Sequence, residues 1–323
     1  MSLRGVVLDL SSLNPQDLDL QPLSNCLPDW QFHQHTEPDQ VDERIRDAQV
    51  IVTNKVRITR QHIEAAPGLG LICVAATGSN IIDLAAAGDA GVAVSNARNY
   101  ATASVVEHVF SLLLTLVRQL DRYRQRVKVG DWSNSPNFCL FDKTIEELSG
   151  KTLGIVGFGV LGQAVGRLAE AFSMRVQIAQ RLHAAPLPDR IPFDQLIETS
   201  DIITLHCPLT AETRGLIRKP QLRRMKDTAI LINTARGGIV DEPDLVHALQ
   251  RHWIAAAGVD VVTQEPPEPS NPLLRYDSPR LIVTPHVAWA SRTARQRLVA
   301  EIVDNIEAFL EGRERNAVSL TRP

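Results

Sequence analysis

Short apolar runs alternate along this chain with segments in which apolar residues recur every three or four positions. Such alternation is typical of parallel β-sheets whose strands are joined by covering helices. In the first part of the chain, the segments Asp39–Asp47 and Thr59–Ala66 have helical patterns. The apolar runs around them predict strands at Val6–Asp9, Val50–Thr53, Leu71–Ala75 and Val92–Ser95.

A long helix is predicted from Thr102 to about Arg126, because apolar residues line one face of this segment. The next segment, Gly130–Lys143, is rich in Asn, Ser and aromatic residues and is expected to be a loop. A second strand series follows, with strands predicted at Leu153–Gly157, Arg175–Ala179, Asp201–His206, Ala229–Thr234, Ala256–Val262 and Leu281–Thr284.

Helices are expected between these strands, two of them with Pro220 and Pro243 at the first helical position. A final helix is predicted from about Ser291 to Leu310. The whole pattern predicts an α/β fold with two doubly wound parallel-sheet domains.

The segment Leu153–Ala171 reads LGIVGFGVLGQAVGRLAEA, which is an apolar strand, a G-x-G-x-x-G loop and a helix. Gly157 permits a tight turn, Gly159 lets the backbone approach a phosphate, and Gly162 lets the helix pack on the strand. The positive end of the helix would then face the anion. This context indicates a dinucleotide-binding loop.

Composition, charge and cysteine spacing disfavour nucleic-acid-binding, membrane and disulfide-rich proteins. The 323 residues suffice for two domains, and a formal net charge of −3 gives no reason to expect a nucleic acid or membrane partner. No signal peptide is apparent, and the longest apolar run, Val105–Val117, is interrupted by polar residues such as His108, so a cytoplasmic protein is expected. No CxxC pair occurs among the cysteines, so no metal site or disulfide framework is expected; they are Cys26, Cys73, Cys139 and Cys207.

Candidate reactive side chains follow three successive apolar strands of the second series. Arg236 lies in LINTARGGIVDE, Asp260 and Glu265 lie in GVDVVTQEPP, and His286 lies in IVTPHVAWAS. In open α/β sheets, ligands bind at the carboxyl ends of the strands. Hydride transfer to a 2-oxo acid needs a cation for the carboxylate, a proton donor, and a carboxylate that keeps the donor protonated. Arg236, His286 and Glu265 match those needs.

These motifs, in this order and spacing, resemble those of the D-isomer-specific 2-hydroxyacid dehydrogenase family over nearly the whole chain. The segments Phe138–Gly150 and AATGSN are most similar to its glycerate dehydrogenase (hydroxypyruvate reductase) branch. The resemblance implies hydride transfer between NAD(P)H and a small 2-oxo acid, with hydroxypyruvate/D-glycerate or glyoxylate/glycolate as the expected pair.

The resemblance also implies a role for each candidate. Arg236 would bind the substrate carboxylate and help to polarise its keto oxygen. His286 would donate the proton in reduction, and Glu265 would orient the imidazole and stabilise its charged form. Further implied substrate-binding residues, in the first domain, are Asn54, Thr77 and Gly78.

For the cofactor, the resemblance implies that the glycine loop and the backbone N–H groups of Val160 and Leu161 bind the pyrophosphate. Other positions that contact the cofactor in relatives hold Thr102, Cys207, Pro208, Thr213, Ala235 and Asp260. Dehydrogenases that prefer NAD usually carry an acidic residue about 20 positions after the glycines, at the end of the second strand. That place holds Gln180, followed by Arg181, so we expect NADPH to be used at least as well as NADH.

The family topology implies a flavodoxin-like substrate-binding domain, residues 1–98 and 291–323, in which a Rossmann cofactor domain, residues 99–290, is inserted. Relatives are dimers joined through the long helix and the loop after it. A homodimer is therefore expected. Trp132 and Phe138 are candidate interface aromatics, with packing in the core as the alternative.

An alternative from a different class stays open. Some proteins of this fold are NAD-sensing corepressors, in which dinucleotide binding regulates the recruitment of a partner. Loss of NAD(P)H absorbance on addition of a 2-oxo acid would distinguish an enzyme from such a sensor.

Overall fold

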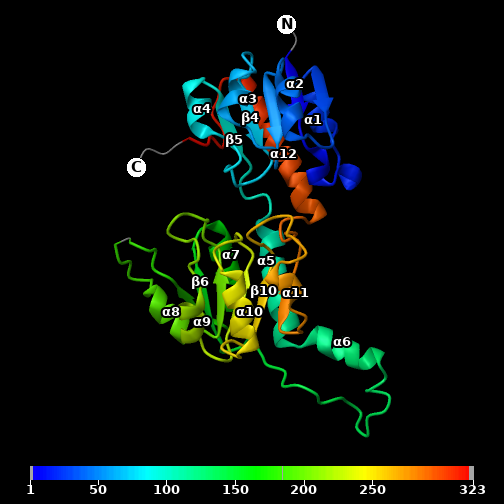
Figure 1. Cartoon of the computed structure of the whole chain (residues 1–323), viewed down its shortest axis with the longest axis vertical. Helices are drawn as coiled ribbons and strands as arrows, with labels where there is room; N and C mark the ends of the chain where they lie inside the picture. Colours follow the sequence, from blue (N-terminus) through cyan, green and yellow to red (C-terminus); the bar gives the residue numbers. More distant parts are fainter. Residues whose placement is uncertain (1–2, 184, 320–323) are drawn as a thin grey trace. The chain divides into compact units, whose positions relative to one another are not determined.

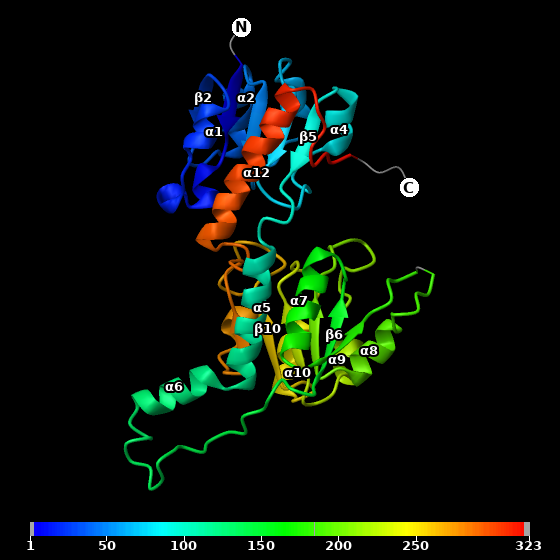
Figure 2. The ribbon, with the colours of Figure 1, turned by 180° about the vertical axis from the view of Figure 1, so that it is seen from behind.

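The computed structural model describes residues 3–183 and 185–319 and divides the chain into two compact units (Figures 1 and 2). Unit 1 comprises Met1–Ala101 and Ala290–Pro323, and unit 2 comprises Thr102–Trp289. The ends of the expected substrate-binding domain, at residues 1–2 and 320–323, lie outside the described residues. The assignment of substrate and cofactor binding to separate domains stays a prediction.

Unit 1 is built on a five-stranded sheet in the order β2-β1-β3-β4-β5, and all its strand pairs are parallel. This is the flavodoxin-like order, whose switch point lies between β1 and β3. β2 was not expected from the sequence, because this edge strand is half-exposed and has no apolar run. The strands are β1 (Arg4–Val7), β2 (Asp29–Phe32), β3 (Val50–Thr53), β4 (Leu71–Val74) and β5 (Ala93–Asn96).

Helices cover both faces of this sheet. The predicted final helix is confirmed as α12 (Arg292–Leu310), which contacts β4 and β5 and begins after Ser291, whose hydroxyl accepts a hydrogen bond from the Ala294 amide at 3.2 Å. The other helices are α1 (Gln21–Asn25), α2 (Val41–Ile45), α3 (Arg60–Glu64) and α4 (Leu84–Asp89), with the short 3₁₀ turns Leu10–Leu13, Pro15–Asp17 and Pro38–Gln40.

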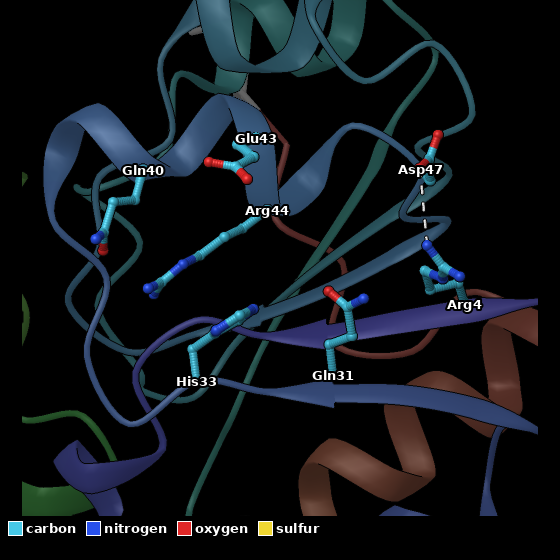
Figure 3. A pocket seen from close by; sticks show the side chains of 7 residues that line it. All are labelled: Arg4, Gln31, His33, Gln40, Glu43, Arg44 and Asp47. Carbon is cyan, nitrogen blue, oxygen red and sulfur yellow. Dashed lines mark ion pairs between the residues drawn. The ribbon is translucent and has the colours of Figure 1, made fainter.

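A polar hollow of about 340 Å³ lies in unit 1 between α2 and the strands β1 and β2 (Figure 3). Both of its arginines already have partners: Arg4 pairs with Asp29 at 2.8 Å, and Arg44 Nη1 donates to the Thr36 hydroxyl at 2.6 Å. None of the site residues expected from the sequence lines this hollow, whose residues are Arg4, Gln31, His33, Gln40, Glu43, Arg44 and Asp47.

Unit 2 contains a six-stranded parallel sheet in the order β11-β10-β9-β8-β6-β7. Beyond β7, an isolated parallel bridge joins Ala179 to Ile191. This bridge lies where the classic Rossmann sheet has its third strand. The strands are β6 (Thr152–Val156), β7 (Arg175–Ile178), β8 (Ile202–Leu205), β9 (Ile230–Asn233), β10 (Ala256–Val259) and β11 (Leu281–Val283).

The prediction of one helix from Thr102 to about Arg126 was wrong. α5 (Thr102–Val117) ends, Gln119 adopts a left-handed conformation with φ of 55°, and α6 (Leu120–Lys128) continues at a bend of 57°. The reason is burial, since α5 packs against α7 and β10 whereas α6 has no buried residue. Among the described helices, none alone is long and apolar enough to cross a membrane, and only the bent pair of α5 and α6 passes that test by length and composition.

The remaining helices of unit 2 lie between its strands. Pro220 and Pro243 are each the second residue of their helix rather than the first, because Lys219 and Glu242 already have helical geometry. These helices are α7 (Val160–Ala171), α8 (Phe193–Thr199), α9 (Lys219–Arg224), α10 (Glu242–Gln250) and α11 (Pro272–Arg275).

Candidate active site

The glycine loop connects β6 to α7 at the switch point of the unit 2 sheet. Gly157 has φ of +94°, and a Cβ there would lie 2.5 Å from the backbone N of Cys207, so only glycine fits. At Gly159, in contrast, a Cβ would meet no atom within 4 Å. Gly159 is the N-cap of the 12-residue helix α7, and the first amides of this helix have no side-chain cap. The loop therefore fits a dinucleotide pyrophosphate.

The candidates after β8 form a tight turn beside Gly157. The Thr213 hydroxyl donates to the Pro208 carbonyl at 2.6 Å and thereby closes this turn. Burial raises the pKa of the Cys207 thiol to about 11, so Cys207 stays protonated near neutral pH and is a poor nucleophile. Burial also lowers the pKa of His206 to about 4, which keeps this end of the sheet free of an extra positive charge.

Gln180, which was expected to contact the cofactor ribose, lies just after β7 and makes side-chain hydrogen bonds within its own loop. The Gln180 side chain donates to the Ala185 carbonyl at 2.7 Å and accepts from the Leu187 amide at 3.2 Å, so it braces its own loop. Arg181 is exposed. Arg190, from the far side of the same loop, places its guanidinium 4.7 Å from the ring centroid of Phe158 in the glycine motif. Two arginines thus flank the loop that follows β7.

Arg236 lies in the loop after β9, which Asn233 shapes. The buried Asn233 side chain accepts from the Ala235 amide and donates to the Arg236 carbonyl, both at 3.1 Å. The guanidinium of Arg236 is exposed, and its Nη1 donates to the Ala235 carbonyl at 2.7 Å. No carboxylate neutralises it among the described residues. This arginine can therefore receive an anionic ligand.

Glu265 is held by the packing of its loop against the loop after β9. Gly237 makes this approach possible, because a Cβ there would lie 1.9 Å from the Val262 carbonyl oxygen. The buried Glu242 carboxylate accepts from the Thr263 amide at 2.6 Å and from the Asn271 side chain at 2.7 Å. Sequence reasoning missed Asn233 and Glu242 as bracing residues, since nothing in their spacing shows which backbone groups they contact.

His286 and Glu265 form the central contact of the site. His286 Nδ1 lies 2.6 Å from Glu265 Oε2, and the other carboxylate oxygen, Oε1, accepts from the Val262 amide at 3.1 Å. The second ring nitrogen of His286, Nε2, makes no hydrogen bond within the described part of the chain. An imidazole oriented through Nδ1 by a carboxylate can hold or release a proton at Nε2.

Asp260 is 1% exposed, and its carboxylate accepts from the backbone amides of Val287 at 3.0 Å and Ala288 at 2.9 Å. Burial would raise its pKa, but hydrogen bonds from His108, Thr284 and these amides outweigh burial and hold the pKa below its usual value. Asp260 is thus an ionised bracing group of the His286 segment. Its expected contact with the cofactor, like those of Thr102 and Ala235, stays a prediction.

The expected substrate residues of unit 1 lie after β3 and β4. Asn54 is only 5% exposed, and its side-chain Nδ2 donates to the Ser12 hydroxyl at 3.1 Å. Thr77 is exposed, with its hydroxyl donating to the Ala97 carbonyl at 2.9 Å, and Gly78 follows it. Substrate contacts by Asn54, Thr77 and Gly78 stay predictions.

Within unit 2, the ends of β6, β8, β9, β10 and β11 meet at one edge of a parallel sheet. That edge carries a phosphate-binding loop, an exposed arginine and a carboxylate–imidazole pair. Among residues 3–183 and 185–319, no group of three or more His, Cys, Asp or Glu side chains is arranged to hold a metal ion. This arrangement can bind a dinucleotide and an anionic substrate and can transfer a proton.

Comparison with known proteins agrees with this chemistry. A family model described as D-isomer specific 2-hydroxyacid dehydrogenase, NAD binding domain, matches residues 110–288. The chain is 44% identical over 308 residues to glycerate dehydrogenase of Methylorubrum extorquens (93% of this chain, 97% of the relative). It is 39% identical over 322 residues to hydroxypyruvate reductase of Blautia hydrogenotrophica (97% and 99%).

Among solved structures, the chain resembles NADPH-dependent glyoxylate/hydroxypyruvate reductase from Sinorhizobium meliloti in complex with NADP and malonate. The TM-score is 0.82 at 27% identity, covering 98% of this chain and 97% of that chain. The sequence match covers 93% of this chain and the structural match covers 98%, so each extends over both units. The chain therefore belongs to the D-isomer specific 2-hydroxyacid dehydrogenase family.

Proposed function

We propose that this enzyme reduces small, unphosphorylated 2-oxo acids to D-2-hydroxy acids, with hydroxypyruvate as the best substrate and glyoxylate accepted. The observation that carries the proposal is the 2.6 Å contact between His286 and Glu265, at the same sheet edge as Arg236 and the glycine loop. The names of the relatives, glycerate dehydrogenase and hydroxypyruvate reductase, support the choice of substrate.

The residues of unit 2 divide the chemistry among themselves. The glycine loop and the first amides of α7 would hold the nicotinamide cofactor, which supplies the hydride when bound. Arg236 pairs with the substrate carboxylate through its guanidinium fork. Glu265 holds His286 through Nδ1, so Nε2 donates the proton that the nascent alkoxide requires.

A substrate panel tests this function. Oxidation of NADH and of NADPH is followed with hydroxypyruvate, glyoxylate, pyruvate and 2-ketogluconate. We expect the highest kcat/KM with hydroxypyruvate. A tenfold preference for pyruvate would contradict the substrate assignment but not the reaction. Cofactor binding with no turnover on any 2-oxo acid would instead favour the NAD-sensing alternative.

We further propose that NADPH is used at least as well as NADH, because the position just after β7 holds Gln180 instead of an acidic residue and arginines flank the loop there. Replacing Arg181 with alanine is expected to lower kcat/KM for NADPH by about 10-fold or more, because one charge-assisted contact to the 2′-phosphate is lost. The kcat/KM for NADH should stay unchanged. Arg175→Ala is the control, because this exposed arginine lies at the opposite end of β7. Strong NADH preference that Arg181→Ala does not alter would refute the assignment.

Arg190 is the second cation of this site, held near the glycine motif by Phe158. Gln180→Asp is expected to shift preference toward NADH, since an acidic side chain repels a 2′-phosphate and accepts from ribose hydroxyls. The Gln180 amide braces the loop through Ala185 and Leu187, so Gln180→Glu serves as a longer acidic variant that can still accept from the Leu187 amide.

We also propose a homodimer joined through α6 and the segment 129–145. This region exposes several large apolar side chains, which is unusual for a monomer: Leu120, Val127, Val129, Trp132, Phe138, Phe141 and Ile145. Phe138 and Phe141 are 92% and 86% exposed. Light scattering should give a mass near twice 35.6 kDa. Phe138→Ser with Phe141→Ser should shift that mass toward the monomer, whereas Leu274→Ser, at an exposed leucine on α11, should not.

A further inference from the structure

His108 is a polar side chain on a helix that otherwise buries apolar residues. Its neighbours along the inner face of α5, including Val105, Val109 and Leu112, are buried in unit 2. The His108 imidazole reaches the ends of β10 and β11, where its Nε2 lies 2.9 Å from the Thr284 hydroxyl and 3.4 Å from Asp260 Oδ1. The proposed mechanism gives this histidine no role.

The hydrogen-bond directions follow from the number of protons available. The Thr284 hydroxyl lies 2.6 Å from Asp260 Oδ1 and must donate its single proton to that ionised carboxylate. Thr284 can then only accept from His108, so His108 carries a proton on Nε2. His108 is therefore a donor to the Thr284–Asp260 pair.

Asp260 connects this pair to His286 and to the two residues that follow it. The Asp260 carbonyl accepts from the His286 amide at 2.8 Å. Its carboxylate accepts from the next two amides, of Val287 and Ala288. A carboxylate that is 1% exposed needs all its donors, because an unsatisfied buried charge is costly. Loss of His108 would remove one donor and free the Thr284 hydroxyl to rotate.

The backbone of His286 makes this bracing necessary. His286 has φ of 55°, in the left-handed region, which is unfavourable for a non-glycine residue. Such a conformation persists only where surrounding contacts fix it. Besides the contacts to Asp260, the Trp289 indole donates to the His286 carbonyl at 3.0 Å.

We propose that His108 is a positioning residue that, through Thr284 and Asp260, fixes the backbone of His286 and so aligns its imidazole with Glu265. The inference rests on the proposed role of His286 as proton donor. It predicts an effect on kcat with little effect on the binding of the 2-oxo acid, since Arg236 does not contact His108.

The test compares His108→Leu, which removes the donor, with His108→Gln, whose amide can still donate near the position of Nε2. His108→Leu is expected to lower kcat about 10-fold, which corresponds to the loss of one hydrogen bond to a charged group. The KM of the 2-oxo acid should stay within about twofold of wild type. His108→Gln should recover most of the loss. Glu107→Gln, at the adjacent exposed position of α5, is the matched control.

Proton NMR supplies a readout that does not depend on turnover. The proton between His286 Nδ1 and Glu265 Oε2 should give a resonance downfield of the amides, which Glu265→Gln assigns. This resonance should shift or broaden in His108→Leu and persist in His108→Gln. Wild-type kcat and an unchanged resonance in His108→Leu would overturn the proposal, as would equal kcat losses in the Leu and Gln variants. If the wild-type enzyme were inactive on every 2-oxo acid, the proposed function would be refuted instead. The resonance would still test whether His108 is coupled to His286.

Discussion

Replacing His286 with alanine is expected to reduce kcat for 2-oxo acid reduction by about 10²–10⁴-fold, while the affinity for the cofactor stays close to that of wild type. The reason is that His286 Nε2 supplies a proton in the transition state, whereas the glycine loop and α7 hold the cofactor in the ground state. The measurement is steady-state kcat together with the Kd of NADH and NADPH from fluorescence titration. A variant that keeps kcat within a few-fold of wild type would show that another group donates the proton.

Glu265→Gln provides the graded comparison. Glutamine can still hydrogen-bond Nδ1 of the imidazole but removes the negative charge 2.6 Å away. The loss in kcat should therefore be smaller than for His286→Ala. The rate of reduction should also decline at a lower pH than in wild type, because the protonated imidazole loses its charged partner. An unchanged pH profile of kcat/KM would contradict the role given to Glu265.

Replacing Arg236 with glutamine is expected to lower kcat/KM for the 2-oxo acid by about 10²-fold or more. The exposed guanidinium has no carboxylate partner in the described residues, so its charge is available to the substrate carboxylate. Arg236→Lys should recover little of this loss, because an ammonium keeps the charge but not the bidentate fork. The effect should appear mainly as a raised KM for the 2-oxo acid, with cofactor affinity unchanged.

Arg251→Gln serves as the control for Arg236→Gln. It makes the same change of charge at an exposed position that caps the end of α10. If both variants lost activity equally, the effect would be one of net charge. If Arg236→Gln left the KM for hydroxypyruvate unchanged, the substrate carboxylate would have to bind elsewhere.

Local pattern was enough to predict the parallel sheets and the glycine loop. The strands of a parallel sheet are buried on both faces, so β3 (Val50–Thr53) and β6 (Thr152–Val156) each contain an apolar run, VIV and LGIV. The edge strand β2 was not predicted, because two of its four residues are exposed and it has no apolar run. The candidate residues Arg236, Glu265 and His286 could be selected because each follows a strand, and parallel strands bring their carboxyl ends to one edge. Their roles stay predictions.

The sequence by itself determined the fold class, the dinucleotide loop and the residue types of the site, because these depend on periodicity and on short-range spacing. Tertiary structure alone decided where α5 stops, since burial ends at Val117 while the helical pattern continues. It also decided that Gln180 braces its own loop and that His108, far away in the chain, donates to the Thr284–Asp260 pair. Hydrogen bonds between distant residues leave no periodic trace, because each depends on the direction of a side chain in the folded chain.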